Sequence, residues 1–212
     1  MNRGFNKIET EICNFIEEDN IYNKSFNNIN FVDNINSINF TDCIFDGCTF
    51  DIEIYNSTFT NCLFINSDLS NTIIDECGLH YVSFVNSKLV GLNLSNSILK
   101  NSILENNVCM MLNFFHLDIK LCDFKNNNMT SSRLYNIKLS KVSFVDNKMT
   151  AIEIIDTSLK NIDLRSNDIN NIVVSLNDIK GCIIDVNQVF DFIKLLEVVI
   201  KWSLLKFNYF YC

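Results

Sequence analysis

The 212-residue chain contains no proline, only five glycines and a single alanine, Ala151. Proline cannot donate a main-chain hydrogen bond, so its absence is typical of a fold in which almost every N–H belongs to a ladder. No hydrophobic run reaches the roughly 18 residues of a membrane span, and the N-terminal sequence lacks the apolar core of a secretory signal. We therefore expect a cytoplasmic protein that does not enter a membrane.

Apolar residues recur at every fifth position from Ile54 to Ile184, twenty-seven times without an exception. A period of five fits neither the 3.6 of a helix nor the 2 of a plain strand. It fits a coil built of short straight sides. Each side directs two side chains inward, at positions i and i+2, and is followed by a corner. Four sides make a square coil of twenty residues, and coils stack at about 4.8 Å. The pattern predicts an all-β solenoid of about eight coils.

The second inward position lies two residues before each apolar centre and is mostly small. Its first members are Ser57, Cys62, Ser67, Thr72 and Cys77. Two departures from the frame occur nearer the N-terminus, where Ile35 and Ile54 each come one residue early. We expect each of these deletions to bend or bulge the stack locally, as imperfect repeats near a terminus often do.

Three segments carry a recognisable repeat unit: NFTDCIFDGCTF (39–50), STFTNCLFINSDLSNT (57–72) and VSFVNSKLVGLNLSNSIL (82–99). They resemble the small–polar–Leu/Phe–polar–polar unit of the pentapeptide-repeat family. The resemblance covers about residues 26–184 and implies a right-handed quadrilateral β-solenoid. The chain departs from the family at the small position, where Ser, Cys, Ile, Leu or Asn stands in place of the usual Ala.

The solenoid is predicted over residues 23–184, with a cap at each end because a bare coil would expose strand edges and core. Residues 1–22 are expected to cap the N-terminus, with a helix over 6–18. Residues 185–202 are expected to form a C-terminal helix, N-capped by Asp185 or Asn187, and a strand. The tail, residues 203–212, is aromatic and lies outside any repeat.

The C-terminal segment IIDVNQVFDFIKLLEVVIK (183–201) resembles the C-terminal helix of the quinolone-resistance (Qnr-type) pentapeptide proteins. That resemblance implies a head-to-head homodimer formed through the helix and the strand after it. Glu197 departs from the group, which tends to have Gly there. The expected interface residues share the apolar face of the helix: Val189, Phe190, Ile193 and Leu196.

Nine cysteines would suit a disulfide framework in a secreted protein, but the repeat frame gives most of them another role. Cys109 takes an apolar centre, and six others occupy the small inward position: Cys43, Cys48, Cys62, Cys77, Cys122 and Cys182. We interpret them as small buried hydrophobic groups in a reducing compartment.

Positions twenty apart should stack, so Asn107, Asn127, Asn147 and Asn167 are predicted to form an internal amide ladder.

Charge is distributed unevenly along the chain. Residues 1–80 carry thirteen Asp and Glu against three Lys and Arg, whereas residues 81–212 carry twelve against fourteen. No basic residue lies between Ser25 and Ser87, where an acidic belt is predicted to face outward: Asp42, Asp46, Asp51, Glu53, Asp68, Asp75 and Glu76. Such a belt could occupy a groove that binds DNA, because both present spaced negative charge to Lys and Arg.

An outward column of lysines forms a second candidate surface. Lys100, Lys120, Lys160 and Lys180 are twenty or forty residues apart, with Asp118 and Asp178 expected to offset part of their repulsion. A functional interpretation is a basic stripe that binds an acidic partner. The structural interpretation, which the pattern favours, is a solvated face that resists aggregation. Direct nucleic-acid binding is not expected.

Enzymatic function is not expected. The chain has no glycine-rich phosphate loop, no C-x-x-C and no H-E-x-x-H, and no cofactor, metal or small-molecule substrate is expected. Ser97 and Lys100 fit an S-x-x-K pattern, but the frame points one inward and the other outward.

Two binding hypotheses remain. One is a DNA mimic that modulates DNA gyrase or topoisomerase IV and protects it from quinolones; the other is a rigid scaffold for an unidentified protein.

Overall fold

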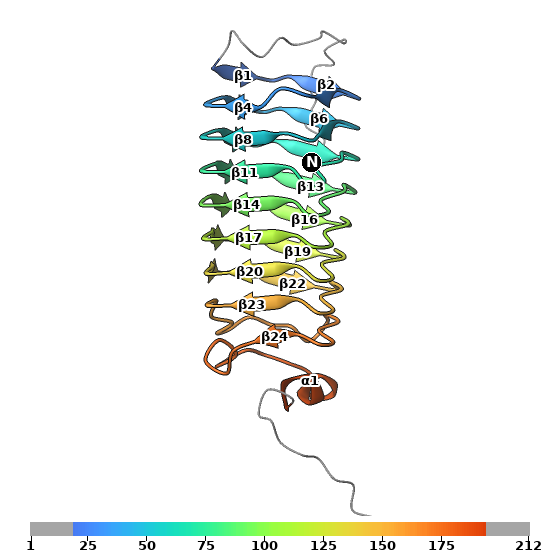
Figure 1. Ribbon diagram of the computed structural model, residues 1–212, viewed down its shortest axis with the longest axis vertical. Coiled ribbons are helices and arrows are strands. Elements are labelled where there is room, and N and C mark those ends of the chain that lie inside the picture. The colour runs from blue at the N-terminus through green and yellow to red at the C-terminus, as the bar shows by residue number, and fades with distance from the viewer. Residues whose placement is uncertain (1–18, 194–212) are drawn as a thin grey trace, which may run out of the picture.

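The computed structural model describes residues 19–193, which form one elongated stack of square coils (Figure 1). Each coil has four sides, and corresponding sides of successive coils pair in parallel to form four sheets along the stack. The first to fourth faces are numbered in the order in which the chain visits them. The predicted all-β solenoid is confirmed, and the period of five residues corresponds to one side of a coil.

The first face is a seven-stranded sheet: β1 (Asn20–Tyr22), β5 (Asn39–Thr41), β9 (Thr58–Thr60), β12 (Gly78–His80), β15 (Ile98–Lys100), β18 (Asp118–Lys120) and β21 (Lys138–Ser140). The second face is also seven-stranded: β2 (Ser25–Asn27), β6 (Ile44–Asp46), β10 (Leu63–Ile65), β13 (Ser83–Val85), β16 (Ile103–Glu105), β19 (Asp123–Lys125) and β22 (Ser143–Val145). The third face contains β3 (Asn30–Phe31) and β7 (Thr49–Phe50), continued by single bridges from Asp68 to Asp168. The fourth face is eight-stranded: β4 (Ile35–Asn36), β8 (Glu53–Tyr55), β11 (Ile73–Asp75), β14 (Asn93–Ser95), β17 (Asn113–Phe115), β20 (Arg133–Tyr135), β23 (Glu153–Ile155) and β24 (Val173–Val174).

Asparagine turns the corners between faces. Between residues 19 and 193, twenty-six non-glycine residues have positive φ, and fourteen of these are Asn. They lie two positions after the inward centre of a side; Asn61 and Asn101, for example, both have φ of 53°. Asn tolerates this left-handed conformation better than most residues because its short polar side chain can bond locally. The high asparagine content therefore has a structural cause that the apolar period alone did not indicate.

The core is filled by the inward centres, and in the first four coils the centres of the second face are phenylalanines stacked from coil to coil. Phe26, Phe45, Phe64 and Phe84 form one column with ring centroids 4.6–4.9 Å apart. That spacing equals the separation of hydrogen-bonded strands, so each ring packs flat on the next. Leu139, Ile179 and Ile184 are inward centres that remain half-buried.

The predicted asparagine ladder is confirmed. Asn107 donates through Nδ2 to Asn127 Oδ1 at 3.0 Å, and the same bond joins Asn127 to Asn147 and Asn147 to Asn167. Each Nδ2 also donates to the carbonyl of an inward centre, as Asn127 does to Leu104 O at 2.8 Å. The four side chains are at most 5% exposed. The ladder thus satisfies main-chain groups that the corners leave unpaired.

The frame departures at Ile35 and Ile54 leave the sheets in register, since Ile35 pairs directly with Ile54. Each deletion shortens the corner between the third and fourth faces. Asn34 Oδ1 accepts the Glu53 N–H at 3.0 Å there, in place of a main-chain carbonyl. The expected bend or bulge is therefore wrong for the paired strands, because the missing residue is absorbed at a corner.

The ends differ from the prediction. The solenoid begins within the segment assigned to the N-terminal cap, because β1 (Asn20–Tyr22) already pairs with β5; the helix predicted over 6–18 lies outside the described residues. At the other end, the short 3₁₀ helix η2 (Val186–Gln188) leads into α1 (Val189–Ile193). Asp185 is the N-cap, as one of the two predicted alternatives, with Gln188 completing a capping box. The strand and tail predicted after the helix lie outside the described residues.

Candidate interaction surfaces

The acidic belt encircles the second and third coils. Asp46 lies on the second face, Asp68 on the third, and Glu53 and Asp75 on the fourth. The other three occupy corners: Asp42, Asp51 and Glu76. The structure places all seven on the outside, but it distributes them around the stack and does not align them in a single strip.

Neighbouring coils hold several of these carboxylates in place. Asp46 accepts a hydrogen bond from Asn66 Nδ2 at 3.1 Å, and Asp42 accepts one from Asn61 Nδ2. Asp75 accepts from Ser95 Oγ at 2.8 Å. Asp68 pairs with Lys88 Nζ at 3.0 Å. Burial alone would raise the pKa of Asp68, but hydrogen bonds from Ser70 and the Lys88 ammonium outweigh it and lower that pKa. Asp51 and Glu76 are exposed.

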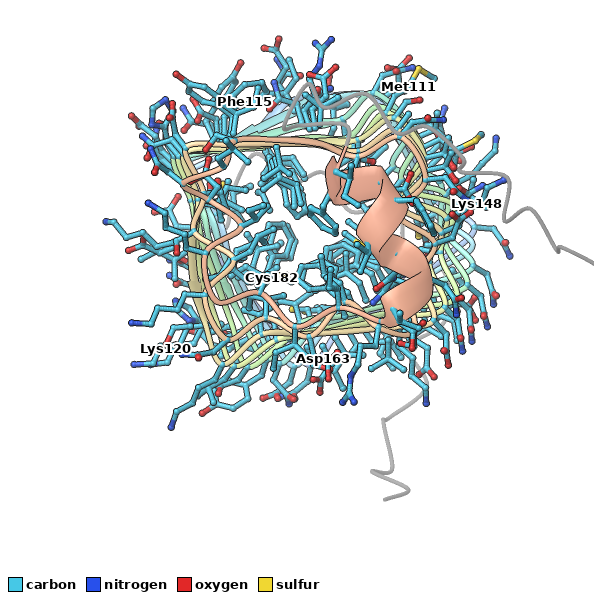
Figure 2. The ribbon with its side chains drawn as sticks, turned by 90° about the horizontal axis from the view of Figure 1, so that it is seen from below. Met111, Phe115, Lys120, Lys148, Asp163 and Cys182 are labelled. Carbon is cyan, nitrogen blue, oxygen red and sulfur yellow. The ribbon has the colours of Figure 1, made fainter. Side chains whose placement is uncertain are left out.

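The lysine column follows the first face. Lys100 stacks directly on Lys120, and Lys120 is followed by Ser140 in the ladder. Lys120 projects from this side of the square (Figure 2). The predicted charge compensation within each side is wrong. Asp118 pairs instead with Lys138 in the next coil at 3.3 Å, and Asp178 accepts from Ser175 Oγ at 2.7 Å. Lys180 donates to Asn177 Oδ1 at 2.8 Å.

An apolar column on the fourth face was missed in the sequence, although its members are twenty residues apart, as Lys100 and Lys120 are. Phe115, Tyr135 and Ile155 follow one another in the ladder of β17, β20 and β23. The Arg133–Glu153 pair, at 3.1 Å, lies beside them. A shallow hollow of about 230 Å³ lies over these side chains. Aromatic and apolar groups exposed together with an Arg are typical of protein-binding surfaces.

The main-chain pairing between the seventh and eighth coils is interrupted on two of the four faces. Sheet pairing ends at β21 on the first face and at β22 on the second, whereas it continues on the other two faces. Within the described residues, no main-chain hydrogen bond joins 138–146 to 158–166. The resulting cavity of about 550 Å³ is lined by Val142, Ser143, Phe144, Val145, Asn161, Asp163, Arg165, Ser166 and Asp185. The unbroken sequence frame gave no sign of this opening.

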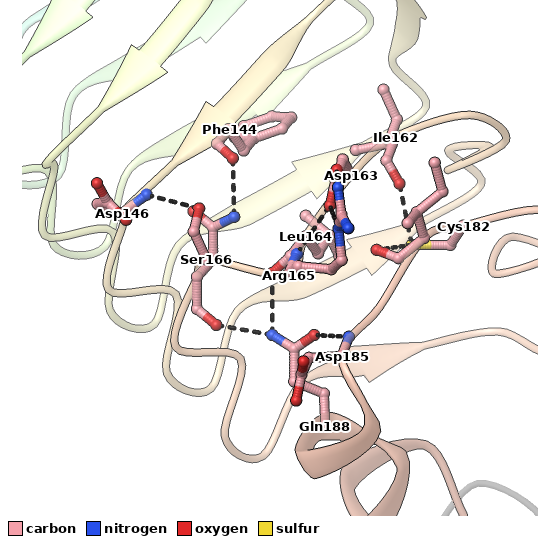
Figure 3. Close-up of polar contacts among 12 residues, drawn as sticks. Phe144, Asp146, Ile162, Asp163, Leu164, Arg165, Ser166, Cys182, Asp185 and Gln188 are labelled. Atoms are coloured by element: carbon pink, nitrogen blue, oxygen red, sulfur yellow. Dashed lines mark hydrogen bonds and ion pairs between the residues drawn. The ribbon is translucent and has the colours of Figure 1, made fainter.

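Side chains replace the lost main-chain bonds around this opening (Figure 3). Asp146 N–H donates to Ser166 Oγ at 3.1 Å. Arg165 N–H donates to Asp163 Oδ1 at 3.1 Å, and the Arg165 guanidinium pairs with the same carboxylate at 2.7 Å. Hydrogen bonds from Arg165 lower the pKa of Asp163, and Asp163 and Asp185 raise that of Arg165. The eighth coil is thus held by local side-chain contacts on these two faces.

The C-terminal end presents apolar side chains to solvent. Val186 is 75% exposed and Phe190 59%, and Val189 is also exposed. Phe192, which the sequence interpretation left out of the apolar face, is the residue of α1 that is buried against the last coil. Leu196 lies outside the described residues. Of the predicted face, Val189 and Phe190 are therefore exposed and Ile193 is half-buried, while Phe192, outside that face, anchors the helix.

The cysteines and the S-x-x-K pair lie as predicted. Cys43, Cys48, Cys62, Cys77, Cys109 and Cys122 are buried free thiols, and Cys182 is half-buried. Burial raises the pKa of Cys109 to about 12. The buried Ser97 hydroxyl donates to Ser95 O, whereas Lys100 lies on the outer side of β15. No group of His, Cys, Asp or Glu within 19–193 is placed to hold a metal ion, and none of the described helices could span a membrane.

The fold and the repeat define the class of the protein. Residues 57–134 match the family model described as a pentapeptide repeat region, so this part of the chain is a pentapeptide-repeat solenoid. No curated protein sequence matches the chain. The stack is similar to a trypsin-treated form of QnrB1, a plasmid-mediated fluoroquinolone resistance protein. The TM-score is 0.63 at 13% identity, over 86% of this chain and 99% of that one. HetL from Nostoc, a pentapeptide repeat protein involved in heterocyst differentiation regulation, matches at 14% identity over 73% and 82%, with a TM-score of 0.29.

Proposed function

We propose that this protein is a non-enzymatic binding protein that modulates type II topoisomerases, DNA gyrase first, by occupying their DNA-binding groove with its acidic N-terminal coils. The observation that carries the proposal is the acidic belt on a narrow rigid rod. Its carboxylates face outward over two coils, in a stretch with no basic residue from Ser25 to Ser87. A groove that holds DNA with Lys and Arg attracts such a surface electrostatically.

The distribution of the belt determines how such binding would work. Because its acids encircle the rod, a groove that wraps the rod would contact them, whereas a flat basic surface would meet only a few. Hydrogen bonds from Asn61, Asn66 and Ser95 hold Asp42, Asp46 and Asp75 in fixed positions. Prior ordering of these groups reduces the entropy lost on binding. The fold that the stack shares with QnrB1, a fluoroquinolone resistance protein, is the reason to include a fluoroquinolone in the test.

A supercoiling assay with DNA gyrase, with and without ciprofloxacin, tests the proposal. We expect the protein to inhibit supercoiling or to rescue it from the drug. Asp51→Asn with Glu76→Gln should weaken the effect, since both residues are exposed corner carboxylates of the belt. Asp146→Asn with Asp156→Asn is the matched control, because these are corner carboxylates of the seventh coil, outside the belt. An unchanged assay with gyrase and with topoisomerase IV would contradict the proposal.

A scaffold for another protein is the second candidate, and the apolar column on the fourth face favours it. Phe115, Tyr135 and Ile155 present a continuous apolar strip beside Arg133. Tyr135→Glu should abolish capture of such a partner and leave any gyrase effect intact, because the acidic belt lies in the second and third coils. The two candidates are therefore distinguishable with variants of a single protein.

A further inference from the structure

The edge of β22 at the opening is unpaired, whereas the strands from β6 to β19 in the same sheet are paired on both sides. Ser143 N–H donates to Cys122 O at 3.0 Å, toward the sixth coil. Successive N–H groups of a strand point to opposite sides, so the Phe144 N–H points toward the opening. A row of main-chain donors and acceptors of this kind is a template for another strand.

The chain contains its own control for this edge. β13 and β22 have the same sequence, Ser-Phe-Val, and occupy the same side of the second face. β13 pairs with β10 on one side and β16 on the other, whereas β22 pairs only with β19. The difference between the two strands is therefore the opening itself.

We propose that the opening between the seventh and eighth coils binds an extended peptide segment of a partner protein by strand addition to β22. Main-chain pairing requires a peptide main chain, which selects this class of occupant over a small molecule. The cavity of about 550 Å³ has the size of ordinary ligand sites. Val145, 37% exposed, supplies an apolar wall for one side chain of the segment.

Charge selects a basic segment. The charged residues that line the opening are Asp163, Asp185 and Arg165. Arg165 is already bound by Asp163 through Nε at 3.0 Å and through Nη2 at 2.7 Å. The lining therefore carries one excess negative charge, which a Lys or Arg of the bound segment would offset. This site is separate from the acidic belt, so it does not depend on the proposed function.

Amide hydrogen exchange and a defined peptide probe test the inference on the full chain. In the free protein, the Phe144 amide should exchange at least about tenfold faster than the Phe84 amide, since Phe84 lies in the doubly paired β13. Acetyl-Val-Lys-Val-Lys-Val-amide should slow exchange at Phe144 and leave Phe84 unchanged. The same peptide with alternate amides N-methylated should bind about tenfold more weakly or worse, because it loses the pairing donors.

Ser143→Trp fills the opening and should abolish binding of the probe, whereas Ser83→Trp, its counterpart in β13, should not. Equal exchange of the Phe144 and Phe84 amides in the free protein would overturn the inference. The edge of β22 would then already be covered, whether by residues 194–212 or by another part of the chain. Equal binding of the methylated and unmethylated peptides would overturn it as well. Both of these measurements use the unaltered protein and do not depend on folding of the variants.

Discussion

The small inward position illustrates how a single residue serves two needs of a solenoid. It must fit inside a corner, and it must satisfy main-chain groups that no strand pairs. Ser67 does both through its hydroxyl, which donates to Phe45 O at 3.0 Å and accepts the Cys48 N–H at 3.1 Å. Asn107 does more, because its amide reaches the next side chain in the column as well. The choice between Ser and Asn therefore sets how strongly adjacent coils are coupled.

Replacing Asn127 with Leu should destabilise the protein by about 2–3 kcal/mol, because the buried Asn107 N–H would lose its acceptor, at about 1–3 kcal/mol, and the Leu104 carbonyl would lose one of its donors. Asn127→Ser should cost about 1 kcal/mol, since a hydroxyl at this position can accept the same N–H, as Ser87 Oγ does from Ser67. Denaturant unfolding followed by circular dichroism measures both. Equal losses for the two variants would show that the ladder contributes packing and no hydrogen bonding.

The Asp163–Arg165 pair should make the opening sensitive to acid. Hydrogen bonding from Arg165 lowers the pKa of Asp163 below its ordinary value of 3.8. Because the pKa of Asp163 is lower in the folded protein, its ionisation stabilises the fold at pH values above the ordinary pKa. This stabilisation is lost as the pH falls through the lowered pKa of the folded state. Arg165→Gln should therefore raise the pKa of the Asp163 carboxyl, as measured by NMR titration. An unchanged titration would mean that the pair does not persist in solution.

At the scale of the element, the position of each side of a coil could be predicted from the sequence, but its pairing with the sides of neighbouring coils could not. Each side repeats one pattern, so the apolar centres such as Phe64 and Leu99 identify strands, faces and register at once. Pairing between two particular coils depends on main-chain geometry that no period records, which is why the opening after β22 was missed. Phe192 was missed for a related reason, because outside the repeats only packing distinguishes the anchor of a short helix from its exposed neighbours.

The C-terminal cap should control the last coil alone. Gln188 Nε2 donates to Leu164 O at 2.9 Å and to Asn167 O at 2.8 Å, and so it closes the asparagine column. Gln188→Glu would direct a carboxylate at these two carbonyls. Because each coil contacts only its neighbours, we expect faster amide exchange in residues 159–193 and little change before residue 120. Gln188→Met is the control, which loses the donor without adding charge; uniform loosening along the stack would contradict local capping.

At the scale of the whole molecule, the two ends of the rod and its sides offer different routes to association. The acidic belt, the lysine column and the apolar column lie on the sides, while the exposed Val186 and Phe190 lie at the C-terminal end. The sequence predicted the belt and the lysine column because a fixed period converts positions into faces. It could not determine that several carboxylates of the belt are held by hydrogen bonds, since those bonds join side chains of different coils.

The exposed C-terminal end predicts a head-to-head dimer, because a second copy related by a two-fold axis would cover Val186, Val189 and Phe190 with the same residues. Light scattering should give twice the 24.5 kDa mass of the chain, and small-angle scattering should give a particle about twice the length of one rod. Phe190→Glu should yield monomers, since it places a charge in the contact. Tyr135→Glu is the matched control on a side face: monomers from this variant alone would mean side-by-side association through the fourth face.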